Sequence, residues 1–125
     1  MPRLIGSPTP IPSVGNKPKL CDEYVGLVNT GEPGLSITVV RSPAGWEGDA
    51  QYGEYDEFRV VFKGMLRVEH DGGIIDVEAG QALHVEPLEW VRFSTPAEDG
   101  AEYINVCMPA FSRATIHREK SKGTP

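Results

Sequence analysis

Short stretches of alternating apolar and polar residues recur along the chain from residue 20 onward, and Gly, Pro and Asp separate them. Alternation with a period of two is typical of strands with one buried face. Helical periodicity is weak, so the pattern predicts an all-β sandwich or barrel. The predicted strands are Tyr24–Val28, Leu35–Val40, Gln51–Tyr55, Phe58–Phe62, Met65–His70, Gly73–Glu78, Ala82–Val85, Val91–Ser94 and Ala101–Met108.

The segments between these strands favour tight reversals, because Gly accepts positive φ and Pro fixes φ. Asp71-Gly72 separates two apolar runs and predicts a hairpin, since Asp-Gly suits the primed turns that match strand twist. Lys63-Gly64 predicts another turn. One short helix is predicted near Ser112–Glu119, after Pro109.

Residues 1–20 carry five prolines, a density that excludes helix and interior strand. They predict an extended N-terminal arm, and residues 21–125 predict one barrel domain, since 125 residues suit a single domain. The arm is either frayed or laid across another surface. Its apolar side chains favour docking: they are Leu4, Ile5, Ile11 and Val14.

The charge and composition of the chain exclude some classes of binding partner. A net charge of −6 without a Lys/Arg cluster predicts no nucleic-acid partner. No apolar run has the length of a signal peptide or a membrane span, so we expect a cytoplasmic protein without a membrane partner. For Cys21 and Cys107 we therefore expect reduced thiols rather than a disulfide.

The spacing of glycines and polar residues carries a resemblance to a known family. This family shares a first motif, G-x5-H-x-H-x3-E-x6-G, and a second, G-x5-P-x-G-x2-H-x3-N. The first spacing falls, with both histidines absent, on Gly45, Gln51, Gly53, Glu57 and Gly64. The second keeps its glycine and falls on Gly80, Glu86, Leu88, Val91 and Thr95.

By this spacing the chain resembles the cupins over roughly Leu35–Phe111. The resemblance implies a double-stranded β-helix, a jelly-roll barrel. Tyr55-Asp56-Glu57, Ala79-Gly80 and Phe93-Ser94-Thr95-Pro96 are similar to the ethanolamine-utilisation type of cupin, which is itself poor in histidine. That shorter similarity suggests carboxylate or acyl-phosphate metabolism without naming a reaction.

In metal-bearing cupins, three imidazoles and one carboxylate hold a divalent ion. The corresponding places here are Gln51, Gly53, Glu57 and Val91, of which only Glu57 is a strong ligand. We therefore expect no metal site and no cofactor. The disfavoured alternative is a divalent metal held by neighbouring, non-standard ligands such as Tyr52, Glu54 or His84.

Glu57 is the candidate catalytic residue. Inside a barrel without metal its pKa would rise, and it could act as a general acid or base. If Arg59 or Arg92 lies close, the pair is instead a structural ion pair or a handle for a polar ligand. The further candidate ligand-binding residues are Gln51, Tyr52, Arg59, His84, Trp90 and Arg92.

Two orientations are open for the strand that carries Glu57 and Arg59. Either Phe58, Val60 and Phe62 fill the barrel, or Glu57 and Arg59 do and the apolar residues pack on a second subunit or the other sheet. The motif position favours the second. Because cupin barrels commonly dimerise through an apolar sheet face, we expect a homodimer.

Three functions remain open at this point. The chain could be a metal-independent enzyme that acts on a small polar or anionic metabolite, with Glu57 transferring a proton. It could be a non-catalytic module that binds such a small-molecule ligand. It could also be an assembly module that uses the arm and an apolar sheet face.

Overall fold

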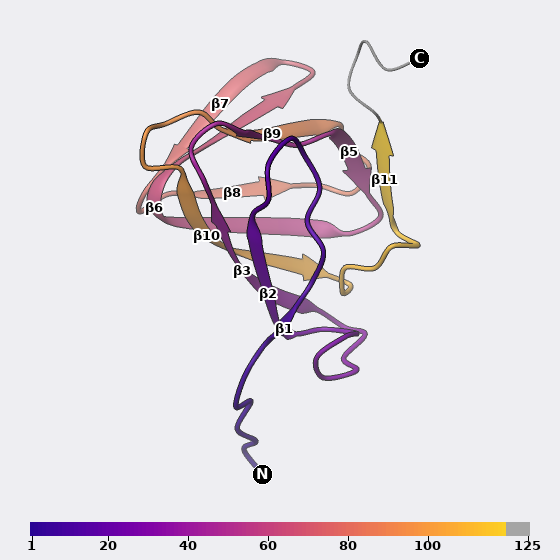
Figure 1. Cartoon of the computed structure of the whole chain (residues 1–125). Coiled ribbons are helices and arrows are strands. Elements are labelled where there is room, and N and C mark those ends of the chain that lie inside the picture. The colour runs from indigo at the N-terminus through magenta and orange to yellow at the C-terminus, as the bar shows by residue number, and fades with distance from the viewer. Residues whose placement is uncertain (120–125) are drawn as a thin grey trace.

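In the computed structural model, which describes residues 1–119, one long strand runs through both halves of a curled sheet in an all-β fold (Figure 1). No helix occurs among these residues, and so none that could cross a membrane. The strands are β1 (Thr9–Pro10), β2 (Leu20–Val25), β3 (Ser36–Ser42), β4 (Trp46–Glu47), β5 (Ala50–Gly53), β6 (Asp56–His70), β7 (Gly73–Glu78), β8 (Ala82–Val85), β9 (Val91–Thr95), β10 (Ala101–Met108) and β11 (Ile116–Glu119).

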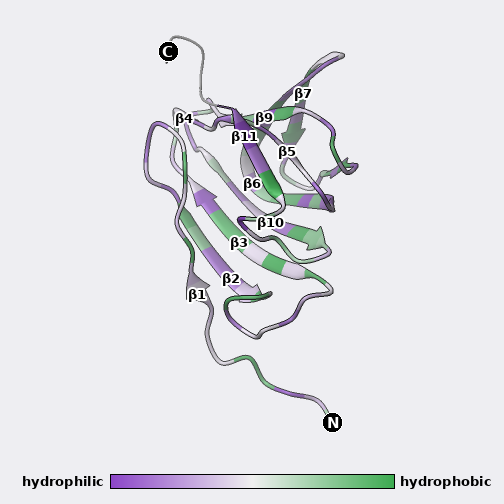
Figure 2. Cartoon of the chain, turned by 90° about the vertical axis from the view of Figure 1, so that its right-hand side faces the viewer, coloured by the Kyte–Doolittle hydropathy of each residue, from purple (hydrophilic) through white to green (hydrophobic). Residues whose placement is uncertain are grey.

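All described strand pairs are antiparallel, and together they form one curled sheet with two halves. The first half has the order β1–β2–β3–β10–β6, with β8 on the other side of β6. The second half joins β6 to β7 and β9, and continues through β5 to β11, while β4 pairs with β9. The halves curl around a common interior (Figure 2).

The passage of β6 from one half to the other occurs at Gly64. The predicted turn at Lys63-Gly64 is wrong, because the chain bends there without leaving the sheet. Gly64 has φ +73°, and a Cβ at this position would collide with the carbonyl oxygen of Gly100. A β-bulge in the pairing of β6 with β10 accommodates one extra residue of β6. The two strands therefore remain paired on both sides of the bulge.

The bend also changes which residues of β6 face the interior. Before it, Glu57, Arg59 and Val61 are buried, and after it Leu66 and Val68 are buried. Alternation with a period of two holds on each side of Gly64 but shifts by one residue across it. The interior therefore has a polar end, near Glu57, and an apolar end.

The Asp71-Gly72 hairpin is confirmed, since His70 pairs with Gly73 across a two-residue loop. The predicted helix near Ser112–Glu119 is wrong. Residues 112–116 close only a single turn, with hydrogen bonds to the carbonyl of Ser112, and the chain then continues as β11. Pairing with the free edge of β5 satisfies the backbone groups that a short isolated helix would leave open.

The strand predicted at Tyr24–Val28 lies earlier in the structure, as β2 at Leu20–Val25. The buried carboxylate of Glu23 accepts hydrogen bonds from the backbone N–H groups of Val28 and Asn29, both at 2.9 Å. These bonds satisfy backbone groups outside the sheet, so the apolar residues there form a loop.

Residues 9–19 of the proline-rich segment lie against the barrel, while Leu4 is exposed. The indole N–H of Trp46 donates to the carbonyl of Val14 at 2.9 Å. Asn16 exchanges backbone and side-chain hydrogen bonds with Glu47. This segment therefore covers one side of the interior.

Two glycines, Gly64 and Gly31, allow the cost of a steric collision at the bend to be separated from the cost of a left-handed backbone. Gly31 has nearly the same φ, +72°, but open space around it. We expect Gly31→Ala to lower the free energy of unfolding by about 1 kcal/mol, the cost of a left-handed backbone for an L-residue. Gly64→Ala should cost about 3 kcal/mol, because collision with Gly100 adds to that strain. Urea unfolding measures both, and equal costs would contradict the role of the bend.

Candidate ligand cavity

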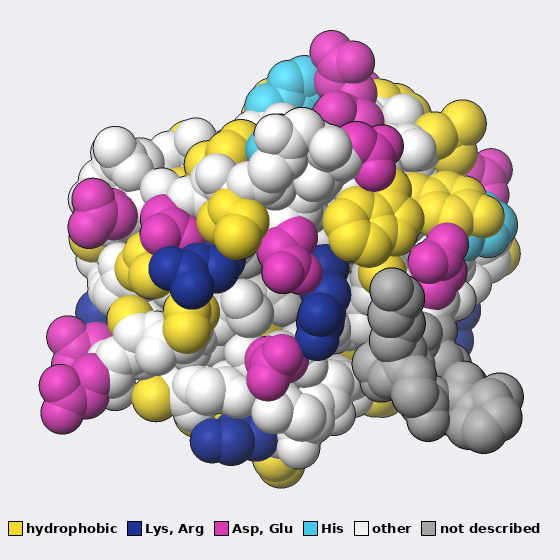
Figure 3. Space-filling view, turned by 90° about the horizontal axis from the view of Figure 1, so that it is seen from above, with side chains coloured by type: hydrophobic (Ala, Val, Ile, Leu, Met, Phe, Trp, Pro, Cys, Tyr) yellow, Lys and Arg dark blue, Asp and Glu magenta, His cyan; other side chains and the backbone are white. Residues whose placement is uncertain are grey.

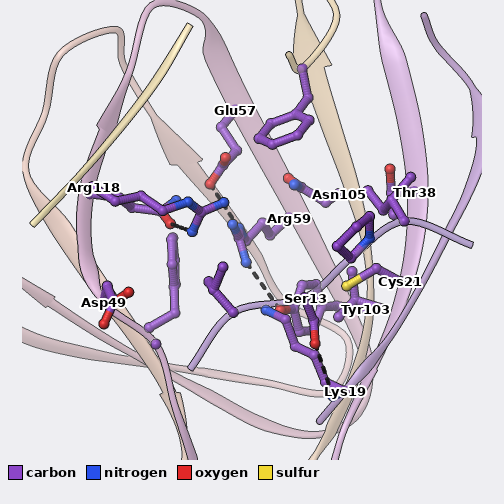
Figure 4. A pocket seen from close by; sticks show the side chains of 18 of the residues that line it. Ser13, Lys19, Cys21, Thr38, Asp49, Glu57, Arg59, Tyr103, Asn105 and Arg118 are labelled. Carbon is purple, nitrogen blue, oxygen red and sulfur yellow. Dashed lines mark hydrogen bonds and ion pairs between the residues drawn. The ribbon is translucent and has the colours of Figure 1, made fainter. Parts of the chain in front are cut away.

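A cavity lies inside the curled sheet, closed on one side by the segment that contains residues 11–19 (Figure 4). Its volume is about 80 Å³, enough for a few water molecules or a ligand of similar size. Trp46, Tyr55 and Phe93 form apolar walls. The polar groups come from both halves of the sheet and from the covering segment.

Glu57 and Arg59 point from β6 into this cavity and form an ion pair. The Nε atom of Arg59 donates to Oε1 of Glu57 at 2.8 Å, and the residues are only 4% and 6% exposed. Because the two residues share strand parity, the alternation that buries one buries both. The structure thus places Arg59, rather than Arg92, beside Glu57.

The guanidinium of Arg59 is held on several sides. Its Nη1 atom donates to the hydroxyl of Tyr103 at 3.1 Å, and its central carbon lies 3.6 Å from the centroid of the Phe93 ring. Burial acts to lower the pKa of Arg59, but the charge of Glu57 outweighs it and raises this pKa above its ordinary value. Arg59 is therefore a fixed positive charge at the polar end of the interior.

Lys19 brings an amine into the cavity from the covering segment. Its Nζ atom lies 3.6 Å from the centroid of the Trp46 ring. Burial, and next the charge of Arg59, lowers the pKa of Lys19 to about 7, although Cys21 and Glu57 act in the opposite direction. Within residues 1–119, no carboxylate forms an ion pair with this amine.

Arg118, an exposed residue of β11, also lines the cavity, where its side chain is partly shielded from water (Figure 4). Its Nη1 atom donates to the neutral amide oxygen of Gln51 at 3.1 Å, and burial lowers its pKa. None of the described carboxylates is in ion-pair contact with it. The cavity thus holds three cationic side chains against the carboxylates of Asp49 and Glu57.

Two further groups complete the polar end. The Oδ1 atom of Asn105 is buried and has no hydrogen-bond partner among the described residues. Cys107 lies with Sγ 3.9 Å from Oε2 of Glu57, and burial followed by the charge of Glu57 raises the pKa of this thiol to about 12. Cys21 and Cys107 are free, as predicted, and the second is protonated near neutral pH.

The four places of the metal motif do not fit a divalent ion. The Arg59 guanidinium already neutralises Glu57, and the ring of Tyr55 fills the space that a side chain at Gly53 would take. Gln51 and Val91 are paired neighbours on β5 and β9, but only the glutamine offers a donor, a neutral amide oxygen. No cluster of three or more metal-ligating side chains occurs anywhere in residues 1–119.

Two predicted ligand-binding residues lie outside the cavity because their strand parity points them outward. Tyr52 is next to Gln51, so the alternation that turns Gln51 inward turns Tyr52 away, where it stacks on His117 with ring centroids 4.9 Å apart. His84 stacks on Phe58 at 4.4 Å and bonds to Asp56 at 2.9 Å on the outer face. Neither residue can contact a ligand in the cavity.

The predicted residues Trp90 and Arg92 also lie elsewhere. Arg92 follows the inward-facing Val91, so its guanidinium lies at the surface, 3.1 Å from Glu47 and 3.6 Å from Glu69. Trp90 is half-buried and does not line the cavity. Of the six predicted ligand-binding residues, the structure brings Gln51 and Arg59 together there.

The sequence also suggested Tyr103 as an aromatic wall of a ligand cavity, and Tyr103 lines it. Sequence reasoning missed several polar cavity residues. Asn105 shares strand parity with the buried Cys107, so alternation along β10 could have found it. Lys19 and Arg118 had no such signal. They lie in segments whose positions depend on docking against distant strands.

The buried ion pair allows a matched comparison with an exposed one. Glu57–Arg59 and Asp76–Arg67 have the same N–O distance, 2.8 Å, but only the first pair is buried. We expect Glu57→Gln to lower the free energy of unfolding by about 3 kcal/mol, because Arg59 keeps a buried charge without its partner. Asp76→Asn should hardly move the urea midpoint, since water screens that pair.

A similar small effect for both variants would contradict the burial of the Glu57–Arg59 pair. The double variant Glu57→Gln/Arg59→Met removes both charges and should recover part of the loss, because no unpaired charge remains. The urea midpoints of all variants can be compared at a single pH.

Comparison with known proteins gives one curated relative and many solved structures. No family model matches the sequence. The endoribonuclease YbeY of Myxococcus xanthus is 30% identical over 104 residues, which is 83% of this chain and 35% of that protein. The chain thus spans about a third of the length of the curated relative that it matches.

Solved structures match over more of the fold. PAC13 of Streptomyces, solved with uridine, has a TM-score of 0.74 at 12% identity over 94% of this chain and 88% of its own. Oxalate decarboxylase of Bacillus subtilis has a TM-score of 0.75 at 18% identity over 91% of this chain and 30% of its own. EutQ of Clostridium difficile has a TM-score of 0.59 at 22% identity over 74% and 63%. At these low sequence identities the structural similarity establishes the fold alone. It shows that the chain is a cupin-fold, jelly-roll domain.

Proposed function

We propose that this domain binds a small anionic metabolite, a carboxylate, in its cavity without a metal ion. The observation that carries the proposal is the placement of Arg118. Arg118 is exposed but lines the cavity, and its side-chain hydrogen-bond partner there is the neutral amide of Gln51. A guanidinium presents paired N–H donors that match the two oxygens of a carboxylate.

The rest of the cavity supports a small ligand of this class. The guanidinium groups of Arg59 and Arg118 supply permanent positive charge, which favours an anionic ligand. The unpartnered Oδ1 of Asn105 offers an acceptor for a hydroxyl or amine on the ligand. Aromatic walls with a few polar groups are typical of small-molecule sites. A volume of about 80 Å³ favours a ligand of few atoms.

Proton transfer through Glu57 is the second candidate, and one contact favours it. Oε1 of Glu57 holds Arg59, whereas Oε2 has only the Sγ of Cys107 at 3.9 Å. An oxygen with such a weak partner can accept a proton from a bound substrate. In this alternative the domain is an enzyme, and Arg59 holds the Glu57 carboxylate in position.

Endoribonuclease activity, which the name of the Myxococcus xanthus relative states, is not part of this proposal. The chain has a net charge of −6. On the face seen from above, the visible basic side chains stand singly among acidic and apolar ones (Figure 3). A surface of this kind repels a phosphate backbone.

We also propose that the outer face of the first half-sheet pairs with a second copy of the chain. Val60 and Phe62 are 44% and 47% exposed there, and Ile104 and Val106 of β10 extend the apolar area. The rim carries both charges, since Lys63 lies 3.5 Å from Glu102. A two-fold copy would cover the apolar centre and place opposite charges across the interface.

For the binding proposal, we expect oxalate to bind and Arg118→Gln to weaken its affinity on the order of 10- to 100-fold, the value of a charge-assisted hydrogen bond. Titration calorimetry measures the affinity, and Trp46 fluorescence gives a second readout. The matched control is Arg67→Gln, which removes an exposed arginine outside the cavity and should leave the affinity unchanged. Equal losses in both variants would contradict a site at Arg118.

For the dimer proposal, light scattering should give twice the chain mass. Phe62→Glu should shift the protein to monomers, because it places a charge in the apolar centre of the interface. Ile74→Glu is the control, since Ile74 is 61% exposed on β7, outside that face. A wild-type monomer, or dissociation by both variants, would refute the proposed interface.

A further inference from the structure

We infer that the cavity takes a small carbonyl acid, a 2-oxo acid or an aldehyde acid, and that Nζ of Lys19 forms an imine with its carbonyl carbon. The inference rests on the proposed function, because the carboxylate of such a compound would occupy the anion site. It adds a covalent step that binding alone does not include.

The position of Lys19 supports this chemistry. The lysine comes from the segment that closes the cavity, and its Nζ lies over the face of Trp46, 3.6 Å from the ring centroid. It lines the same cavity as Arg59 and Arg118 (Figure 4). A carboxylate held by either guanidinium therefore lies in the same cavity of about 80 Å³ as the amine.

The surroundings of Lys19 also favour the neutral amine that such a reaction needs. Burial lowers its pKa to about 7, and the charges of Arg59 on β6 and Arg118 on β11 act in the same direction. Cys21 on β2 and Glu57 on β6 oppose them. Placing a lysine in a desolvated site beside other cationic groups is a known way to make it a nucleophile. Its reactivity should rise between about pH 6 and pH 8 and then level off.

The step balances without an oxidant or a reductant. The lone pair of neutral Nζ attacks the carbonyl carbon, a C–N bond forms as the C=O π bond breaks, and a proton moves from the nitrogen to the oxygen to give a carbinolamine. A second proton, taken up from water, converts the hydroxyl group into a leaving water molecule, and its loss gives the iminium ion. Glu57 lines the cavity, where its carboxylate can carry the proton from nitrogen to oxygen, and Asn105 lines it too and can accept a hydrogen bond from the departing water. Hydrolysis reverses the sequence and regenerates Lys19.

Borohydride trapping tests the inference on the whole chain. The protein is incubated with glyoxylate at about pH 7.5, borohydride reduces any imine to a stable carboxymethyl-lysine, and peptide mass spectrometry locates it. Lys17 and Lys63 are internal controls, because both are exposed. An ordinary lysine is only about 0.1% neutral at this pH, so we expect Lys19 to be modified at least about tenfold faster. Oxalate, which fills the anion site but has no reactive carbonyl, should protect Lys19.

The outcomes separate this inference from the proposed function. If oxalate binds and glyoxylate modifies Lys19 no faster than Lys17 and Lys63, the imine is refuted and the binding function stands. If oxalate does not bind and Lys19 is not preferred, both fail. Lys19→Met should abolish the fast modification. Should that variant unfold, site mapping on the wild-type protein still decides between the outcomes.

Discussion

The burial of one guanidinium, that of Arg59, determines most of the character of the interior. A buried charge is tolerated only if partners replace its water, and here Glu57 and the Tyr103 hydroxyl supply hydrogen bonds while Phe93 supplies a ring face. These partners come from β6, β10 and β9, so one side chain joins both halves of the curled sheet. Burial, and next this same positive charge, lowers the pKa of Lys19.

This arrangement explains how the cupin spacing can persist without the metal ligands. Gly64 allows the bend of β6, because its φ of +73° and the nearby Gly100 leave no room for a side chain. This requirement does not depend on whether the interior holds a metal. Glu57 keeps its inward direction through strand parity, and its positive partner is now Arg59, two residues along the same strand. Because spacing depends on backbone geometry and ligation depends on side-chain type, the two can change independently.

Sequence pattern predicted the elements that local rules determine. β7 and β10 have the predicted bounds, because a two-residue turn and regular alternation fix them. The pattern did not predict β1 and β4, which are too short to show a period. The helix predicted near Ser112–Glu119 was wrong because the free edge of β5, far away in sequence, decides the conformation there.

The same distinction applies to the cavity. Glu57 and Arg59 could be assigned to one face from the sequence alone, since residues two apart in a strand point the same way. Nothing local indicated that Lys19 or Arg118 would join them, because each belongs to a segment that docks through contacts with distant residues. Tyr52 and His84 were chosen for their chemistry, and parity placed both on the outer surface.

The docked segment is therefore part of the site and not an appendage to it. The bond from the Trp46 indole to the carbonyl of Val14 fixes the segment on the same residue whose ring carries the Lys19 amine. Gly15 lies against that indole so closely that a Cβ would collide with its nitrogen. Any shift of the segment would thus open the cavity and withdraw the amine together. Trp46 therefore contacts both the segment that closes the cavity and the Lys19 amine that the segment brings into it.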